Sequence, residues 1–275
     1  MIRNFLHIIQ RLGLCLLVPL VIVGTTNGET SEVDVPEGAQ TWIDVDFREG
    51  VLPEGFDPVS DLDYGEFVTA GYVINIMNDR DELVTGGISG KRINLYGDFE
   101  LTFEYSIEQI EAPLSGSGSG PKIYLQLGHP KRSNTGAAIT LAHFLTPERE
   151  WKYVTVIKPT DAQNRLARLI DAPPVMNGQL RIKRIGRQLI FFGLNEHGEL
   201  VELIRGLVST QDLTFMSLAS SVSGAGHSRI VFKKLTVVQS PPTQITKPQL
   251  LVAITLAVGL GVALLWSYRL IHKVD

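Results

Sequence analysis

The chain has 275 residues, of which 44% are hydrophobic, and a formal net charge of −4. Between residues 29 and 247, 28 acidic side chains outnumber 21 basic ones, and this formal charge of −7 argues against a nucleic-acid-binding domain. The only cysteine, Cys15, lies near the N-terminus, which excludes a disulfide framework, thiol catalysis and cysteine metal sites from the rest of the chain.

The first 28 residues have the pattern of a signal peptide. Arg3 and Arg11 give the segment a positive charge, and the apolar run Leu12–Val23 follows. This run is shorter than the roughly 20 residues that cross a membrane as a helix. We therefore predict a signal peptide over residues 1–28, with an uncleaved membrane anchor as the alternative.

Residues 29–40 are acidic and lack periodicity, which predicts a flexible leader. From residue 41 to residue 239, short runs of alternating apolar and polar side chains predict the strands of one β-domain. The clearest run is 99–107, whose odd-numbered residues are all large and apolar, as expected for a strand on the core. Further strands are expected at 42–47, 72–77, 83–88, 122–127, 138–145, 152–157, 200–207, 213–219 and 230–238.

The segment Gly178–Phe192 predicts a β-hairpin. Leu180 and Ile182 alternate with basic residues, and Gly186 supplies the conformational freedom that a tight turn needs. The basic residues assigned to the solvated side of this hairpin are Arg181, Lys183 and Arg187.

Two stretches interrupt the series of strands. Ser115–Gly120 is of low complexity and is predicted to be a long hairpin loop, because a domain boundary there would leave neither half able to bury its strands. Residues 161–170 predict a short helix capped by Thr160. About a dozen short strands with so little helix are typical of a two-sheet antiparallel sandwich or a barrel.

Three motifs together resemble the concanavalin-A-like jelly rolls, including laminin-G-type domains and their bacterial relatives. They are GDFEL at 97–101, which begins a long strand, the hairpin GQLRIKRIGRQL at 178–189, and the closing strand IVFKKLTV at 230–237. The resemblance covers roughly residues 42 to 238. It implies a jelly-roll sandwich whose last strand pairs with its first, and it transfers no catalytic residue.

Some relatives of this fold are glycoside hydrolases with an E-x-D-x-E strand, whose carboxylates flank the scissile bond. This sequence contains no such motif. The nearest acidic run places Glu199 and Glu202 on opposite faces of a strand, so a solvated edge explains it better.

Laminin-G-type domains often hold calcium, and one loop of this chain offers oxygen ligands for that ion. Its residues are Asp57, Asp61, Asp63 and Glu66. The far ligand of an EF-hand loop is missing, so a solvated acidic loop is the alternative to a calcium site.

The loop from Gly128 to Gly136 is the candidate ligand-binding segment, because it is polar and bounded by glycines. Two aromatic residues downstream are expected to add a stacking surface for a sugar ring. The candidate residues are His129, Lys131, Arg132, Asn134, Trp151 and Tyr153. The alternative is a loop without a binding role above core aromatics.

The C-terminal part predicts a membrane anchor. Residues 240–249 read as a stalk, and 250–268 is an almost unbroken apolar segment of the length of a membrane-spanning helix. Arg269 and Lys273 follow it, so the tail 269–275 is expected in the cytoplasm and the β-domain in the periplasm or outside the cell. A sorting tail is the alternative.

Ala253, Ala257 and Gly261 recur every four residues on one face of this segment, a pattern that allows two spanning helices to form a homodimer. Ordinary Ala and Gly content in a membrane helix is the alternative.

These observations predict an exported, single-pass membrane protein whose β-domain is a non-catalytic binding or adhesion module, with carbohydrate as the first ligand class. A polysaccharide hydrolase or lyase with an unrecognised site, and a purely structural envelope component, are the competing hypotheses. No cofactor other than calcium is expected.

Overall fold

The structure is a computed structural model that describes residues 39–59, 64–95, 97–128, 137–158, 166–208 and 212–240. Within them the chain forms fifteen strands and one 3-10 turn, η1 (Phe47–Glu49). The strands are β1 (Gln40–Asp46), β2 (Phe56–Pro58), β3 (Gly65–Val68), β4 (Gly71–Asn78), β5 (Leu83–Leu95), β6 (Phe99–Ile110), β7 (Ser119–Leu127), β8 (Ala137–Leu145), β9 (Trp151–Lys158), β10 (Leu166–Asp171), β11 (Asn177–Ile185), β12 (Gln188–Leu194), β13 (Leu200–Leu207), β14 (Leu213–Ser223) and β15 (Gly226–Gln239).

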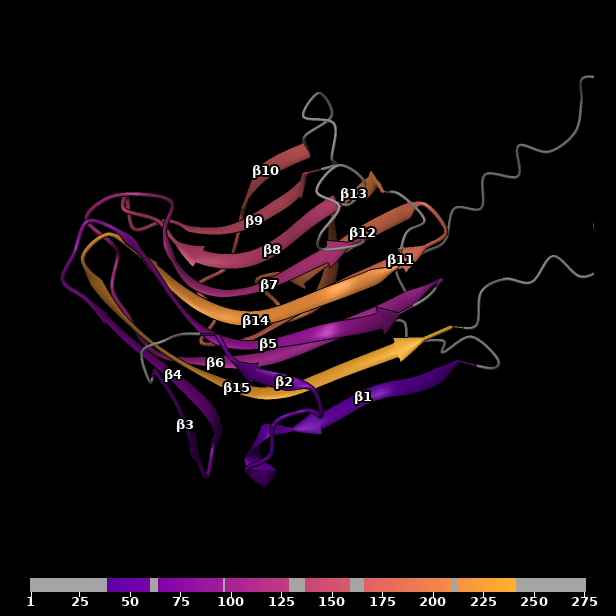
Figure 1. The fold of residues 1–275 in the computed structure, drawn as a ribbon. Coiled ribbons are helices and arrows are strands. Elements are labelled where there is room, and N and C mark those ends of the chain that lie inside the picture. Colours follow the sequence, from indigo (N-terminus) through magenta and orange to yellow (C-terminus); the bar gives the residue numbers. More distant parts are fainter. Residues whose placement is uncertain are drawn as a thin grey trace, which may run out of the picture. The chain divides into compact units, whose positions relative to one another are not determined.

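The strands form two antiparallel sheets, stacked as the layers of a sandwich (Figure 1). The eight-stranded sheet has the order β13-β12-β11-β6-β15-β4-β3, and β1 pairs with the second half of β15. The seven-stranded sheet has the order β10-β9-β8-β7-β14-β5-β2. This architecture confirms the predicted two-sheet sandwich, and the β1–β15 pairing confirms that the last strand joins the first.

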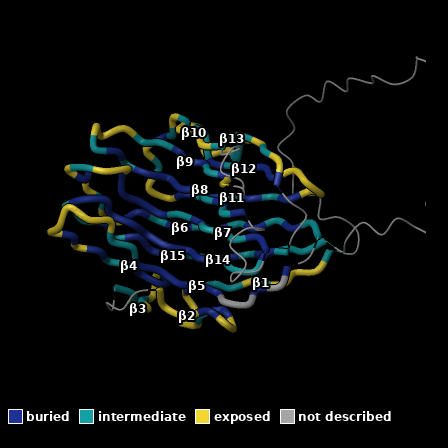
Figure 2. The backbone as a smooth tube through the Cα atoms, turned by 45° about the horizontal axis from the view of Figure 1, so that its top comes forward, coloured by how far each residue is buried: buried dark blue, intermediate teal, exposed yellow. Residues whose placement is uncertain are grey.

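The core lies between the sheets, and Figure 2 shows buried segments along the strands and exposed ones in many of the connecting turns. The apolar side of β6 is buried as predicted, since Phe99, Leu101, Phe103, Tyr105 and Ile107 are each at most 3% exposed. Each such side chain contributes roughly 1.5–3 kcal/mol of burial free energy before entropic costs.

The predicted hairpin at residues 178–192 is confirmed as β11 and β12, and Gly186 in its turn has a φ of 56°. Arg181 and Lys183 are less solvated than predicted, because both pair with Glu100 of β6 at 3.3 Å. Arg184 continues the inward-facing row and is 1% exposed. Its guanidinium donates hydrogen bonds to the carbonyl oxygen of Gly97, from Nε at 2.7 Å and from Nη2.

Two sequence predictions are wrong. Leu166–Asp171, assigned to a helix at 161–170, is the edge strand β10, which pairs with β9. The expected cap Thr160 lies outside the described residues. The loop containing Ser115–Gly120 stays within one domain as predicted, but it connects β6 of one sheet to β7 of the other and so does not close a hairpin.

No helix within the described residues is long and apolar enough to cross a membrane. The predicted signal peptide at 1–28, the predicted span at 250–268 and the dimerisation residues Ala253, Ala257 and Gly261 lie outside those residues.

Candidate functional site

The predicted ligand-binding residues are only partly described by the structure. His129, Lys131, Arg132 and Asn134 lie outside the described residues. Trp151 and Tyr153 both belong to β9, and Trp151 is half-buried against the core.

Tyr153 lies inside the sandwich, 1% exposed. Its hydroxyl donates a hydrogen bond to the carbonyl oxygen of Leu194 at 2.9 Å, and burial raises its pKa to about 12. The missing side chain of Gly193 makes room for the ring, because a Cβ there would lie 2.5 Å from the ring's Cζ. The ring is therefore enclosed between β9 and β12.

Trp151 and Tyr153 both pack on His143 of β8, at centroid distances of 4.7 and 5.0 Å. His143 is fully buried, and its Nε2 lies 3.1 Å from the carbonyl oxygen of Pro173. Because a carbonyl oxygen only accepts, Nε2 carries the proton and Nδ1 accepts from the hydroxyl of Tyr105 at 2.8 Å. Burial lowers the pKa of His143 to about 4, so the ring is neutral near pH 7. This cluster is a satisfied polar network inside the core.

The predicted calcium ligands are not brought together in the described part of the chain. Asp57 lies on β2 and Glu66 on β3, which belong to different sheets. Asp61 and Asp63 lie outside the described residues. Among the residues that the structure describes, no group of three or more His, Cys, Asp or Glu is placed to hold a metal ion.

The register of the seven-stranded sheet identifies the side chains that lie on its outer face. Ile88, Leu218, Ile123 and Leu141 point into the core, so their neighbours along each strand point outward. One outward row crosses all seven strands and consists of Asp57, Ser89, Ser217, Tyr124, Thr140, Val156 and Ala167.

Tyr124 of β7 and Phe215 of β14 form an aromatic pair on this face. Their ring centroids are 5.9 Å apart with an interplanar angle of 70°, and both rings are half-buried. Gln126 lies opposite Phe215, and Thr140 lies opposite Tyr124. These four residues are called the aromatic platform. The platform combines two ring surfaces with hydroxyl and amide groups, as required to contact both the apolar face and the hydroxyls of a sugar.

Sequence reasoning missed Tyr124 and Phe215. They are 91 positions apart along the chain, and only the pairing of β7 with β14 brings them together. A local signal exists for Tyr124, which lies two residues from Gln126 on the same face of β7, just before the predicted ligand-binding loop.

Lys122 lies beside the platform on the same face of β7. Its ammonium donates to the Oγ1 of Thr85 at 3.2 Å, and burial lowers its pKa to about 8. Its neighbours across the strands are the small residues Ala219 and Ala142. Lys122 is therefore a cationic donor beside the platform.

The described strands of this sheet present only two carboxylates outward, Asp57 on β2 and Asp171 on β10. These strands are the opposite edges of the sheet, six strand spacings apart. At about 4.8 Å for each spacing, the two strands are separated by roughly 29 Å. Acid-base hydrolysis of a glycosidic bond needs two carboxyl groups roughly 5–10 Å apart.

A scan against protein-family models finds no match, and a search of curated proteins finds none either. Solved structures do share the fold. SCLam, a non-specific endo-β-1,3(4)-glucanase from family GH16, is 10% identical and gives a TM-score of 0.54, with 75% of this chain and 93% of the other covered.

Two further solved structures are similar. Apo Crh5 transglycosylase is 10% identical with a TM-score of 0.51, covering 74% of this chain and 85% of its own. The CBM2 module of the Lactobacillus casei BL23 phage J-1 evolved Dit is 12% identical with a TM-score of 0.50, covering 73% of this chain and 96% of its own. At these identities the similarity concerns the fold alone. The domain that the structure describes is a concanavalin-A-like β-sandwich.

Proposed function

We propose that this protein is a membrane-anchored, exported module that binds carbohydrate without cleaving it. The ligand would lie on the outer face of the seven-stranded sheet, across the aromatic platform. The predicted loop at 128–136 follows β7 directly, so its residues His129, Lys131, Arg132 and Asn134 are proposed to complete the site.

The observation that carries this proposal is the Tyr124–Phe215 pair. These two rings lie on the solvent side of the sheet. They therefore add no apolar contact to the core, which lies on the other side. Their edge-to-face packing leaves ring surface available beside Gln126 and Thr140, and Lys122 adds a cationic donor in the next row. The glucanase among the structures of similar fold motivates glycan as the ligand class.

Binding is favoured over hydrolysis because of the separation between Asp57 and Asp171. Two carboxylates on opposite edges of the sheet cannot flank one glycosidic bond. The described strands of this sheet carry no other carboxylate. Glu150, just before β9, and Asp171 are both ion-paired with the ammonium of Lys152, at 2.8 and 2.6 Å, so this cation already engages both carboxylates.

The location of the module is proposed from the sequence. The signal peptide at 1–28 and the apolar segment at 250–268 support an exported domain on a single membrane helix, with the tail 269–275 in the cytoplasm. Calcium at Asp57, Asp61, Asp63 and Glu66, and a helix-mediated homodimer, remain proposals of the same kind.

A glycan screen of the full chain in detergent tests the proposal. It is run once with calcium at about 1 mM, which suits calcium sites of modest affinity, and once with a chelator. We expect retention of a polysaccharide or oligosaccharide class, with no release of shorter products from it. Product release that persists in the chelator would favour the hydrolase hypothesis. A screen in which no glycan is retained would contradict the proposal.

A further inference from the structure

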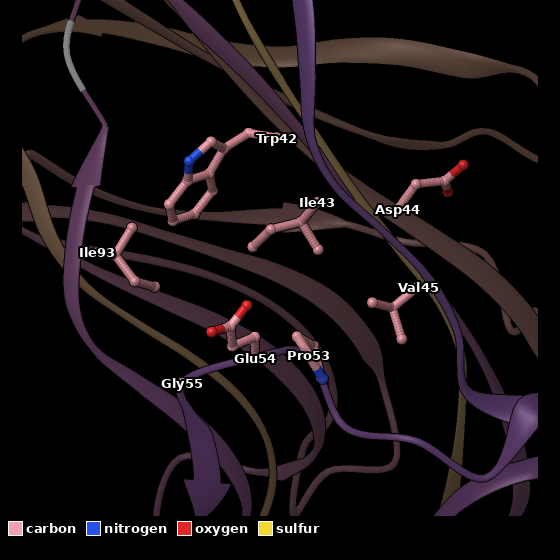
Figure 3. Close-up of a pocket in the computed structure, with 8 residues that line it drawn as sticks. All are labelled: Trp42, Ile43, Asp44, Val45, Pro53, Glu54, Gly55 and Ile93. Atoms are coloured by element: carbon pink, nitrogen blue, oxygen red, sulfur yellow. The ribbon is translucent and has the colours of Figure 1, made fainter.

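A pocket of about 560 Å³ opens at the edge of the sandwich where β1 of one sheet approaches β2 and β5 of the other (Figure 3). Its volume is in the range of small-molecule sites in proteins. Its lining combines an apolar surface with an indole ring and carboxylates, and consists of Trp42, Ile43, Asp44, Val45, Pro53, Glu54, Gly55 and Ile93. We call it the edge pocket.

A β-bulge places Trp42 at this pocket. Thr41 pairs with Val238 and Ile43 pairs with Val237, so Trp42 between them has no partner in the ladder. Bulges of this kind redirect a side chain at the edge of a sheet. The indole lies over the pocket in Figure 3 and is 42% exposed, an unusual position for a large ring that the core does not use.

A tight turn holds Glu54 on the opposite side. The amide of Phe56 donates to the carbonyl oxygen of Pro53 at 3.0 Å, and Gly55 has a φ of 78°, which a type II turn requires at that position. Phe56 is 6% exposed and anchors the turn in the core. The carboxylate of Glu54 points into the pocket in Figure 3.

Among the side chains that the structure describes, none forms a hydrogen bond or ion pair with the carboxylate of Glu54. The other acid of the lining differs in this respect. Asp44 points away from the pocket in Figure 3, and its carboxylate pairs with the ammonium of Lys234 at 3.0 Å. Within the part of the pocket whose side chains are described, one unpaired negative charge therefore lies beside an indole face.

We propose that the edge pocket binds an organic ammonium group carried on an apolar or ring-shaped body. The ammonium would pair with Glu54, and the body would lie against Trp42 and the apolar floor of Ile43 and Ile93. An indole attracts cations through its π face, and a carboxylate adds direct charge pairing, so both sides of the pocket favour the same ligand charge. The same arrangement disfavours anionic ligands.

Two sources carry this chemistry, the amino group of an amino sugar and the side chain of lysine in a peptide. The site is distinct from the aromatic platform, which lies on the outer face of the seven-stranded sheet, and it does not depend on the proposed function.

The test is a titration of the full chain in detergent with glucosamine, with Nα-acetyl-lysine methylamide and with neutral N-acetylglucosamine, followed by calorimetry. We expect at least one ammonium compound to bind, and N-acetylglucosamine to bind about fivefold more weakly, the size of one partly exposed charge contact. Binding of glucosamine alone would assign an amino sugar, and binding of both ammonium compounds would assign the ammonium group itself.

Variants separate the pocket from general charge effects. Glu54→Gln is expected to weaken ammonium binding about fivefold, and Trp42→Leu to weaken it by a similar factor. Glu49→Gln, which removes the same charge from exposed η1 outside the pocket, is the matched control and should leave binding unchanged. Both altered pocket side chains are exposed, so thermal unfolding of the variants should match the wild type.

Three results would overturn the proposal. They are the failure of both ammonium compounds to bind, equally strong binding of N-acetylglucosamine, and unchanged ammonium binding by Glu54→Gln.

Discussion

The hydroxyl of Tyr105 donates a hydrogen bond to Nδ1 of His143 at 2.8 Å, and this contact joins the two sheets through the middle of the core. Tyr105 lies on β6 and His143 on β8, and both side chains are at most 1% exposed. Every polar atom of the pair has a partner, because Nε2 of His143 meets the carbonyl oxygen of Pro173. A buried contact of this kind specifies how the sheets are aligned.

Tyr105→Phe should destabilise the domain by about 1–3 kcal/mol, because it leaves Nδ1 of His143 buried without a donor. Urea unfolding of the full chain measures this change. Tyr124→Phe is the control, since the hydroxyl of Tyr124 has no partner among the described residues and should change stability by no more than about 0.5 kcal/mol. Equal effects of the two variants would contradict the assigned contact.

The free energy of unfolding of the domain should decrease as the pH falls, over a range set by the pKa of His143. Burial depresses the pKa of this ring from 6.5 to about 4, so between these values the unfolded chain binds more protons than the folded one. Stability therefore rises with pH, and the contribution is fully present above pH 6.5 and lost as the pH falls through 4. Between pH 7.5 and 4.5 the loss amounts to roughly 2–3 kcal/mol.

Unfolding measured at both pH values checks this expectation. His143→Gln keeps a donor and an acceptor but does not titrate, so it should lose roughly 2–3 kcal/mol less than the wild type over the same interval. A variant with the same pH dependence as the wild type would show that His143 does not cause it.

Gly178→Ala should disturb the same contact from the neighbouring strand. A Cβ at Gly178 would lie 2.2 Å from Cζ and Oη of Tyr105, and overpacking of this kind costs about 1–3 kcal/mol. Gly226→Ala is the matched control, because its Cβ would meet Val222, Pro113 and Glu111 only at ordinary contact distances of 3.4 to 3.9 Å. Thermal unfolding measures the change. Equal decreases in the midpoint temperature of the two variants would argue against this close approach.

Arg184→Met should destabilise the domain by about 1–3 kcal/mol, because the carbonyl oxygen of Gly97 loses a charged donor and the new side chain cannot replace it. The guanidinium also lies 4.9 Å from the ring centroid of Phe99. Arg187→Met changes an exposed residue of the same hairpin turn and serves as the control. Denaturant unfolding compares the two, and a neutral Arg184→Met would refute a structural role for the buried arginine.

Period-two alternation was sufficient to predict most strands, because one side of β6 and of the hairpin is apolar and must face the core. It failed at residues 166–170, where the spacing of Leu166, Leu169 and Ile170 also fits a helix. Pairing with β9 decides in favour of a strand, and this contact is not visible in the local sequence.

The candidate sites were less predictable, because they depend on register and on a bulge. Trp42 belongs to a run that alternates cleanly, and only the pairing of Thr41 and Ile43 with β15 shows that it is displaced. From the sequence, Tyr153 is predicted to be part of a stacking surface for a sugar ring. In the structure, alternation along β9 directs its side chain into the core beside His143. Arg184 continues the inward row, and nothing local indicates the carbonyl of Gly97 as its partner.

The central claim is that the aromatic platform binds glycan, and calorimetric titration of the retained glycan tests it most directly. Phe215→Ala and Tyr124→Ala should each weaken binding about tenfold, corresponding to roughly 1.4 kcal/mol of lost ring contact. Phe67→Ala removes a partly exposed ring from β3 of the other sheet and should leave the affinity unchanged. Wild-type affinity in both platform variants, or an equal loss in Phe67→Ala, would contradict the claim.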